Sequence, residues 1–256
     1  MASYVLICGQ QINKMLTLEQ KINLSKNIIE KAVSDYQNIF FSFSGGKDSA
    51  VMLDLVYKIK PNIKIVGIDT GYEFEETIEF TDRLMKKYGT EIEYLRPTEE
   101  QHEEILKHYR STAPGEIGGL LDGKVSSFVK DGQWYCCAHK EPALRNFLER
   151  GEYNAWLTGL RADETENRKL VGIYQKGKNG IQKINSIIFW ESPDIWEYIK
   201  LNNLGYHPKY DQGYKSLGCK PCTEAGLREG KGMQSRFEDI GLSGERSNGS
   251  ECGLHI

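Results

Sequence analysis

One cysteine of this sequence has neighbours that favour reaction over burial. Cys252 lies in residues 251–256 (ECGLHI), between small residues and His255. The approach from Gly241 is rich in glycine and serine, a composition typical of flexible chain. We expect a mobile C-terminal tail that can carry a thiolate nucleophile into and out of a pocket. On position alone, an unremarkable surface thiol is an equal alternative.

Four further cysteines form two close pairs. Cys136 and Cys137 are adjacent, and Cys219 and Cys222 form a C-x-x-C motif. Four thiolates suit zinc or an iron–sulfur cluster. Zinc sites usually use two spaced pairs, which an adjacent pair fits poorly, but spacing alone leaves zinc, a cluster and unligated thiols open. The sixth cysteine, Cys8, is expected to be a packed strand residue.

A glycine-rich loop at residues 44–49 (SGGKDS) is suited to binding an anion. It follows a β-rich run and precedes a helical pattern, so its backbone N–H groups would face a ligand at a helix N-terminus. Phe41 and Asp48 stand where a Walker A loop needs glycine and a hydroxyl residue, so the loop is of another type. The alternative is a strand-to-helix turn without a ligand.

Strands and helices alternate around this loop. The pattern predicts helices over residues 18–36, 50–59, 77–88 and 99–109, and strands over residues 39–41, 63–68, 91–95 and 155–158. Such alternation is typical of an α/β fold with a parallel sheet flanked by helices. The site of such a fold lies outside the carboxyl ends of the strands. The loops after Phe41 and Ile68 are both expected at that edge.

Composition limits the classes of function. A chain of 256 residues, 39% of them hydrophobic, can bury a full core. Its 33 basic and 36 acidic residues give a net charge of −3, which provides no global field for nucleic acid. We find no apolar run near about eighteen residues and no pattern of a secretory leader. We therefore expect a cytoplasmic protein without membrane contact, whose cysteines are reduced.

Several motifs together resemble the assimilatory sulfonucleotide reductases, which act on adenylylsulfate or phosphoadenylylsulfate. The loop SGGKDS resembles the PP-loop of ATP pyrophosphatases and their relatives. The other motifs are residues 68–72 (IDTGY), Cys136-Cys137, residues 156–161 (WLTGLR), residues 214–223 (YKSLGCKPCT) and residues 251–255 (ECGLH).

The resemblance implies a PP-loop fold, of the adenine nucleotide alpha hydrolase-like kind. It predicts an N-terminal helical extension over residues 1–38, a nucleotide-binding domain over residues 39–218, and a C-x-x-C segment with the catalytic tail over residues 219–256.

The resemblance also implies a two-stage reaction. Cys252 would attack the sulfur of the activated sulfate, releasing the nucleotide and leaving an S-sulfocysteine. Thioredoxin or glutaredoxin would then free sulfite. The two cysteine pairs would hold a [4Fe-4S] cluster that tunes the site without carrying the electrons; these ligands are Cys136, Cys137, Cys219 and Cys222.

Cations must offset the charge of the substrate. A thiolate meets a sulfate ester with a repulsion of about 4 kcal/mol for unit charges about 4 Å apart at an effective dielectric constant near 20. Basic side chains and loop N–H groups can oppose it, although exposed Arg and Lys are usually only solvated. The candidate substrate ligands are Ser44, Gly45, Gly46, Lys47, Ser49, Thr70, Lys140, Gly159, Arg161, Arg168, Arg228, Lys231 and His255.

The sequence departs from the family pattern at two places. Lys140 is one residue nearer to the adjacent cysteines than the lysine of the family. The R-x-G-R-W segment before ECGLH is absent, and its nearest counterpart is residues 228–231 (REGK).

Several questions stay open. The intact SGGKDS keeps an alternative function alive: a PP-loop ATP pyrophosphatase that adenylates a substrate for sulfur insertion into nucleic acid. The near-neutral charge and the ECGLH tail oppose it. Cluster-containing members of the family that the sequence resembles mostly take adenylylsulfate, so the resemblance favours this substrate over its 3′-phosphorylated form, without excluding the latter. The sequence leaves open whether the chain forms a homo-oligomer.

Overall fold

The structure is a computed structural model. It describes residues 16–71, 73–110, 120–121, 124–125, 127–130, 133–136, 139–165, 167–177 and 180–218. For residues 106–110 and for the described parts of 120–136, only the course of the backbone is described.

Six α-helices and two short 3-10 helices occur in the described residues. They are α2 (Leu18–Asp35), α3 (Lys47–Tyr57), α4 (Glu75–Tyr88), α5 (Glu99–Arg110), α6 (Lys140–Glu149), α7 (Ser192–Leu201), η1 (Asn167–Leu170) and η3 (Pro208–Gln212). The four helices expected from the sequence are confirmed, with ends shifted by a few residues. Helices α6 and α7 were not expected.

The strands of the main sheet are β1 (Ile39–Ser42), β2 (Lys64–Ile68), β3 (Glu93–Leu95), β8 (Ala155–Leu157), β9 (Tyr174–Lys176) and β10 (Gln182–Ile184). Two further pairs of strands form small antiparallel hairpins, and these are β4 (Leu120–Leu121) with β5 (Lys124–Val125), and β6 (Ser127–Lys130) with β7 (Gln133–Cys136). The four strands expected from the sequence are confirmed.

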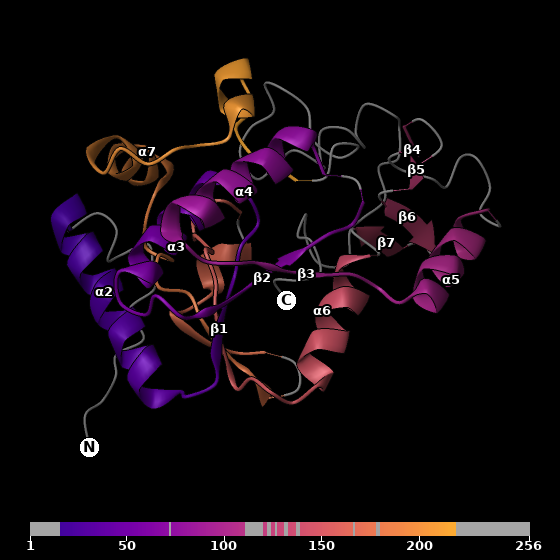
Figure 1. Cartoon of the computed structure of the whole chain (residues 1–256), viewed down its shortest axis with the longest axis horizontal. Helices are drawn as coiled ribbons and strands as arrows, with labels where there is room; N and C mark the ends of the chain where they lie inside the picture. The colour runs from indigo at the N-terminus through magenta and orange to yellow at the C-terminus, as the bar shows by residue number, and fades with distance from the viewer. Residues whose placement is uncertain are drawn as a thin grey trace. The chain divides into compact units, whose positions relative to one another are not determined.

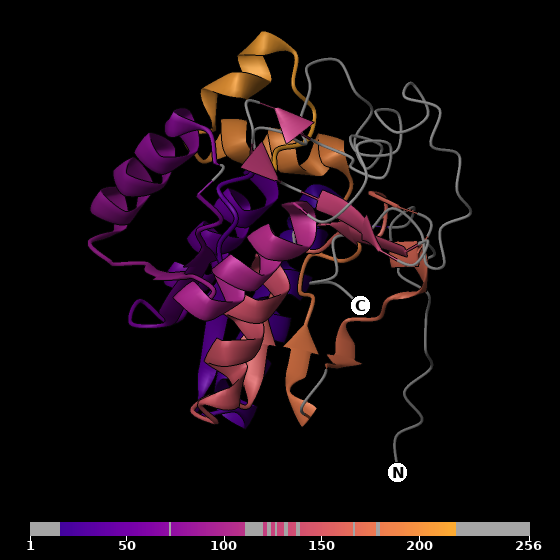
Figure 2. The same cartoon turned by 90° about the vertical axis from the view of Figure 1, so that its right-hand side faces the viewer.

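The main sheet has the strand order β3-β2-β1-β8-β10-β9. Strand β1 pairs in parallel with β2 and β8, and β8 pairs in parallel with β10. This confirms the expected parallel α/β sheet. Strand β9 departs from the pattern, because it runs antiparallel to β10 (Figure 2). The connection from β9 to β10 is too short for a crossover helix, so the two strands form a hairpin.

The chain divides into two compact units, which we describe separately. The first unit consists of Met1–Val66, Asp82–Ile92 and Glu152–Tyr206, and the second of Gly67–Thr81, Glu93–Gly151 and His207–Ile256. In the first unit, helix α3 contacts both α2 and α7 (Figure 1). Central strand β1 is buried on both faces, as its run of apolar residues predicts.

A buried carboxylate fixes helix α3 within the first unit. Asp54 accepts hydrogen bonds from the hydroxyls of Tyr198 at 2.6 Å and Tyr88 at 2.8 Å, and it pairs with Lys58 at 2.6 Å. Burial, together with the neighbouring Asp54 charge, raises the pKa of both tyrosines, so they remain donors. These bonds tie the helix that follows the glycine-rich loop to α7 and to the end of α4.

Helices α5 and α6 are linked in the second unit. The side-chain amides of Gln101 and Asn146 exchange hydrogen bonds at 2.8 and 3.1 Å, and α6 contacts β3. No helix in the part of the chain that the structure describes is long and apolar enough to cross a membrane.

Candidate functional site

The glycine-rich loop joins the end of β1 to the start of α3. Gly45 has a φ of +76°, a conformation that favours glycine, and Gly46 is the N-cap residue of α3. The Ser49 hydroxyl donates to the Gly46 carbonyl at 2.9 Å and accepts from the Ser44 hydroxyl at 3.2 Å. The first N–H groups of α3 have no carbonyl partner within the helix, and together with the helix dipole they favour an anion.

Gly159 approaches this loop from β8, the strand beside β1. A Cβ atom at Gly159 would lie 3.4 Å from the Ser49 backbone nitrogen and 3.5 Å from the Asp48 carbonyl. These are ordinary contact distances. The glycine therefore leaves space beside the first turn of α3, where a larger residue would crowd the peptide group between Asp48 and Ser49.

Buried charges surround the same turn. Lys47 is 2% exposed, and its amino group lies 3.3 Å from a carboxylate oxygen of Asp48. Asp48 also accepts from the guanidinium of Arg161 at 2.5 Å. Arg161 is fully buried and donates through Nε to Asp163 at 3.0 Å. Arg161 is thus held between two carboxylates, and it neutralises the acidic residue inside the loop.

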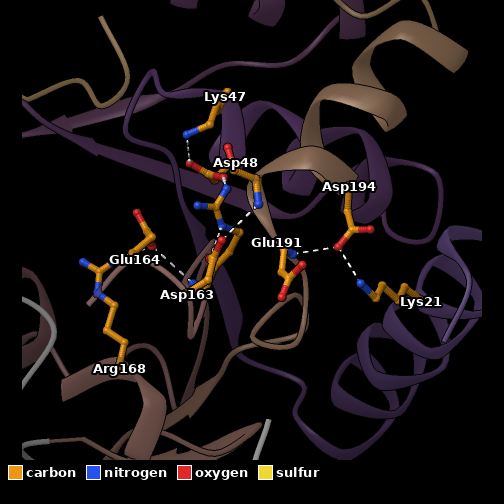
Figure 3. A network of polar contacts seen from close by, with 10 residues as sticks. Lys21, Lys47, Asp48, Asp163, Glu164, Arg168, Glu191 and Asp194 are labelled. Atoms are coloured by element: carbon orange, nitrogen blue, oxygen red, sulfur yellow. Dashed lines mark hydrogen bonds and ion pairs between the residues drawn. The ribbon is translucent and has the colours of Figure 1, made fainter. Parts of the chain in front are cut away.

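The network continues to helix α7. The second oxygen of Asp163 accepts the backbone N–H of Ser192 at 3.0 Å, in the first turn of α7. Asp194 then accepts the backbone N–H of Glu191 at 2.7 Å and pairs with Lys21 of α2 at 2.6 Å (Figure 3). Both carboxylates lie at the N-terminus of α7, where a negative charge is stabilising.

A second ion pair lies beside Arg161. Glu164 accepts a hydrogen bond from the Arg168 guanidinium and a longer one, 3.3 Å, from the Arg161 backbone N–H (Figure 3). Burial raises the pKa of Glu164 above its usual range. Arg168 opposes this shift and the Asp48 charge adds to it.

Hydroxyl and amide groups fix the end of β8. The Thr158 hydroxyl donates to the Asn185 side-chain oxygen at 2.5 Å, and the Asn185 amide donates to the Gly172 carbonyl at 2.9 Å. Within the first unit, the fold therefore brings together seven candidates from the sequence, namely Ser44, Gly45, Gly46, Lys47, Ser49, Gly159 and Arg161. Arg168 joins them through Glu164.

Thr70 lies in the second unit, in the loop after β2. Its hydroxyl donates to Glu73 at 2.7 Å. The preceding Asp69 accepts the Gly71 N–H at 2.8 Å and pairs with Arg96. Although burial opposes the shift, the bonds from Arg96 and Gly71 lower the pKa of Asp69. The loop is thereby closed as a tight turn.

Lys140 begins helix α6, and the adjacent cysteines come just before it. Strand β7 ends at Cys136. His139 is buried, and its Nε2 lies 3.1 Å from Nδ1 of His102 on α5. Burial, with a contribution from His102, lowers the pKa of His139 to about 4. This contact between the two imidazoles ties the residue before α6 to α5.

The segment that leads to the other cysteine pair is anchored in the second unit. His207 is fully buried, accepts the Lys209 N–H at 3.1 Å through Nδ1, and contacts the Thr77 hydroxyl at 2.9 Å through Nε2. Because Nδ1 accepts, Nε2 carries the proton and donates to Thr77. Lys209 pairs with Glu76 at 2.9 Å. The start of the segment 207–218, which precedes Cys219 in the chain, is therefore anchored to the first turns of α4.

The remaining predicted site residues lie outside the described residues. These are Cys137, Cys219, Cys222, Arg228, Lys231, Cys252 and His255, together with Cys8. In the part of the chain that the structure describes, no group of three or more His, Cys, Asp or Glu could hold a metal ion. The predicted metal centre would consist of the four paired cysteines. The described segments that precede each cysteine pair in the chain belong to the second unit.

The sequence analysis missed the acidic half of the site. Asp48, Asp163 and Glu164 were not among the predicted ligands, although each is adjacent to, or within three residues of, a predicted basic ligand. That alternation of charge was the available signal, since buried cations require nearby anions.

The parallel sheet with a glycine-rich loop at a helix N-terminus defines an α/β protein of the PP-loop class. The structure is similar to an FMN adenylyltransferase from Candida glabrata, with a TM-score of 0.56 and 17% identity, over 83% of this chain and 68% of that chain. That likeness shows the fold alone.

More specific matches define the family. Residues 38–225 match the phosphoadenosine phosphosulfate reductase domain, and the chain belongs to this family. It is 32% identical to adenosine 5′-phosphosulfate reductase 1 of Bacillus subtilis, over 90% of this chain and 89% of that protein. It is also similar to phosphoadenylyl-sulfate reductase from Candida auris, solved as a phosphate complex, with a TM-score of 0.58 and 26% identity over 82% of this chain and 98% of that chain.

Proposed function

We propose that the protein reduces an adenosine sulfonucleotide to sulfite in sulfate assimilation. The observation that carries this proposal is the glycine-rich loop, whose helix N-terminus opens beside Gly159, in a chain of the reductase family. The loop is built to hold the phosphate of the nucleotide through backbone N–H groups. Family membership supports a sulfur group as the reacting part of the substrate.

In the first stage, Cys252 supplies the nucleophile. Its thiolate attacks the sulfur of the sulfate group, a bond forms between the two sulfur atoms, and the bond from that sulfur to the bridging oxygen breaks. The electron pair leaves with AMP, or with its 3′-phosphorylated form. The enzyme then carries an S-sulfocysteine at position 252. The N–H groups of the first turn of α3 stabilise the charge on the leaving phosphate.

In the second stage, a dithiol protein such as thioredoxin or glutaredoxin supplies two electrons. One of its thiolates attacks Sγ of Cys252, forming a mixed disulfide and releasing sulfite. Its second thiol then resolves the mixed disulfide, so that Cys252 is reduced and the partner is oxidised. This stage needs no electron from a metal.

The four cysteines predicted as metal ligands have the donor chemistry of a [4Fe-4S] cluster. Four thiolates in two pairs suit such a cluster, and Cys136 ends strand β7 in the same compact unit as residues 207–218, which precede Cys219. When bound, the cluster would tune the charge of the site. The hydrogen bond between His139 and His102 would hold the backbone after the first pair.

The choice of nucleotide is a separate part of the proposal. We favour adenylylsulfate, because a four-thiolate pattern accompanies that substrate in the family that the sequence resembles. The relatives carry both names: the Bacillus subtilis protein is an adenosine 5′-phosphosulfate reductase, and the Candida auris protein is a phosphoadenylyl-sulfate reductase. Sulfite release from each nucleotide at matched concentrations, with thioredoxin as reductant, distinguishes the two.

The test of the mechanism is Cys252→Ser. We expect this variant to fold and bind AMP, but to form no S-sulfo adduct and no sulfite, because it lacks the thiolate. The wild-type protein without thioredoxin should accumulate the adduct at residue 252, seen by mass spectrometry of peptides. Substantial sulfite release by the variant would refute the mechanism. Release of pyrophosphate from ATP, without sulfite from either nucleotide, would instead support the ATP pyrophosphatase.

A further inference from the structure

In the part of the chain that the structure describes, six charged side chains beside the glycine-rich loop pair with one another. Three are cations and three are carboxylates, namely Lys47, Arg161 and Arg168 with Asp48, Asp163 and Glu164. Because each of these cations already has a carboxylate beside it, a substrate anion must compete with that carboxylate for the cation.

Arg168 is the member of this set that an incoming anion can reach. The side chain of Arg161 is fully buried and that of Lys47 is 2% exposed, whereas that of Arg168 is 14% exposed. Its partner Glu164 is 16% exposed. Arg168 also lies on the short helix η1, which has fewer backbone bonds to hold it than a long helix.

Glu164 accepts hydrogen bonds from Arg161 and Arg168, which lie within four residues of it in the chain, whereas the other two carboxylates join separate elements of the fold. Asp163 is tied to Nε of Arg161 and to the backbone of α7, and Asp48 belongs to the first turn of α3. Besides its bond to Arg168, Glu164 accepts the Arg161 N–H at the longer distance of 3.3 Å. A carboxylate on a guanidinium also has the charge and geometry of a sulfate or phosphate in the same place.

We propose that Glu164 is an internal counter-anion that occupies the Arg168 guanidinium until the phosphosulfate group of the substrate displaces it. This inference rests on the proposed function, because it takes the sulfonucleotide as the competing anion. It makes Glu164 a specificity-determining residue: a ligand must carry enough negative charge to replace a carboxylate that is already bound. A neutral nucleoside would not do so.

Displacement has a consequence for protons. Glu164 interacts with Asp48 and Lys47 of α3, with Arg161 of the loop after β8 and with Arg168 of η1, and Asp163 precedes it in the chain. Burial already raises its pKa, and loss of the Arg168 contact raises the pKa further. The displaced carboxylate therefore binds a proton at a higher pH than the paired carboxylate does. By linkage, substrate binding takes up protons at a pH between the pKa of Glu164 in the free protein and its higher pKa in the complex, and affinity increases as the pH falls through this range.

The test compares Glu164→Gln with the parent protein by titration calorimetry. Both carry Cys252→Ser, so that adenylylsulfate is bound without being consumed, and both acid groups of this ligand stay ionised across the neutral range. We expect Glu164→Gln to bind adenylylsulfate about tenfold more tightly, a factor typical of one charge-assisted hydrogen bond, with adenosine binding unchanged. Adding Arg168→Gln should remove the gain.

A matched control removes one negative charge elsewhere in the first unit. Asp35 pairs with Lys31, four residues away on α2, and Glu164 pairs with Arg168 at the same spacing. Asp35→Asn should leave the affinities for adenylylsulfate and for adenosine unchanged. Proton uptake is measured in the parent protein from the binding enthalpy in buffers of different ionisation enthalpy. This second measurement needs no folded Glu164 variant. We expect uptake in the parent protein and its loss in Glu164→Gln.

Three results would overturn the proposal: equal affinity of Glu164→Gln and the parent for adenylylsulfate, an equal gain for adenosine, or no proton uptake by the parent. Any of these results, together with sulfite release by the protein with Cys252 intact, would refute the role of Glu164 as a counter-anion and leave the proposed function standing. Absence of both nucleotide binding and sulfite release would refute the proposed function as well as the role of Glu164.

Discussion

Replacement of Gly159 by alanine should weaken nucleotide binding without unfolding the protein. The new Cβ would lie 3.4 Å from the Ser49 nitrogen and 3.5 Å from the Asp48 carbonyl, which are ordinary contact distances. The φ of Gly159 is not positive, so alanine is compatible with the backbone. The melting temperature should therefore be unchanged or slightly raised, because alanine restricts the unfolded chain.

The effect on binding follows from the position of that methyl group. It would lie over the peptide group that joins Asp48 and Ser49, and it would crowd a phosphate bound to the Ser49 N–H, which has no carbonyl partner within α3. A hydrogen bond to a charged group contributes about 1.5 to 3 kcal/mol, so the dissociation constant for AMP should rise roughly tenfold to hundredfold. Titration calorimetry with AMP measures this directly, and thermal melting reports on folding.

Gly172→Ala is the matched control. A Cβ at Gly172, in the same compact unit, would contact the Tyr174 carbonyl at 3.7 Å, and among the described residues no atom of the glycine-rich loop lies within 4 Å of it. It should change neither the melting temperature nor AMP binding. If Gly159→Ala bound AMP as tightly as the wild-type protein, the first turn of α3 would not be the phosphate site, and the geometric reasoning would be wrong.

Two further predictions concern the core and the cysteine pairs. Tyr198→Phe removes a 2.6 Å hydrogen bond to buried Asp54 and should lower the free energy of unfolding by about 1 to 3 kcal/mol. Urea denaturation measures this loss. An unchanged midpoint would mean that the carboxylate finds another donor. Cys137→Ser and Cys219→Ser should each lose most of the iron and acid-labile sulfide of anaerobically purified protein, since each removes a ligand from a different pair. Wild-type iron content in either variant would contradict the ligand assignment.

The sequence by itself determined the class of fold and the position of the anion loop. Alternating strand and helix patterns require a parallel sheet, and Gly45 and Gly46 follow the run that became β1. These are local signals: periodicity, glycine and the residues next to it in the chain are enough to predict them. The α6 and α7 helices and the β9–β10 hairpin were missed, and only the packed structure revealed them.

Only the tertiary structure decided which charges pair. Arg161 and Asp48 are 113 residues apart in the chain, and nothing in either segment indicates that they meet at 2.5 Å. The sequence predicted Arg161 and Arg168 as ligands of the substrate, whereas the fold gives each of them a carboxylate partner. Attraction between charges depends on their separation in space and on burial, not on their order in the chain. The balance of charge around the loop, and hence the role proposed for Glu164, therefore appears only when strands β1 and β8 lie side by side.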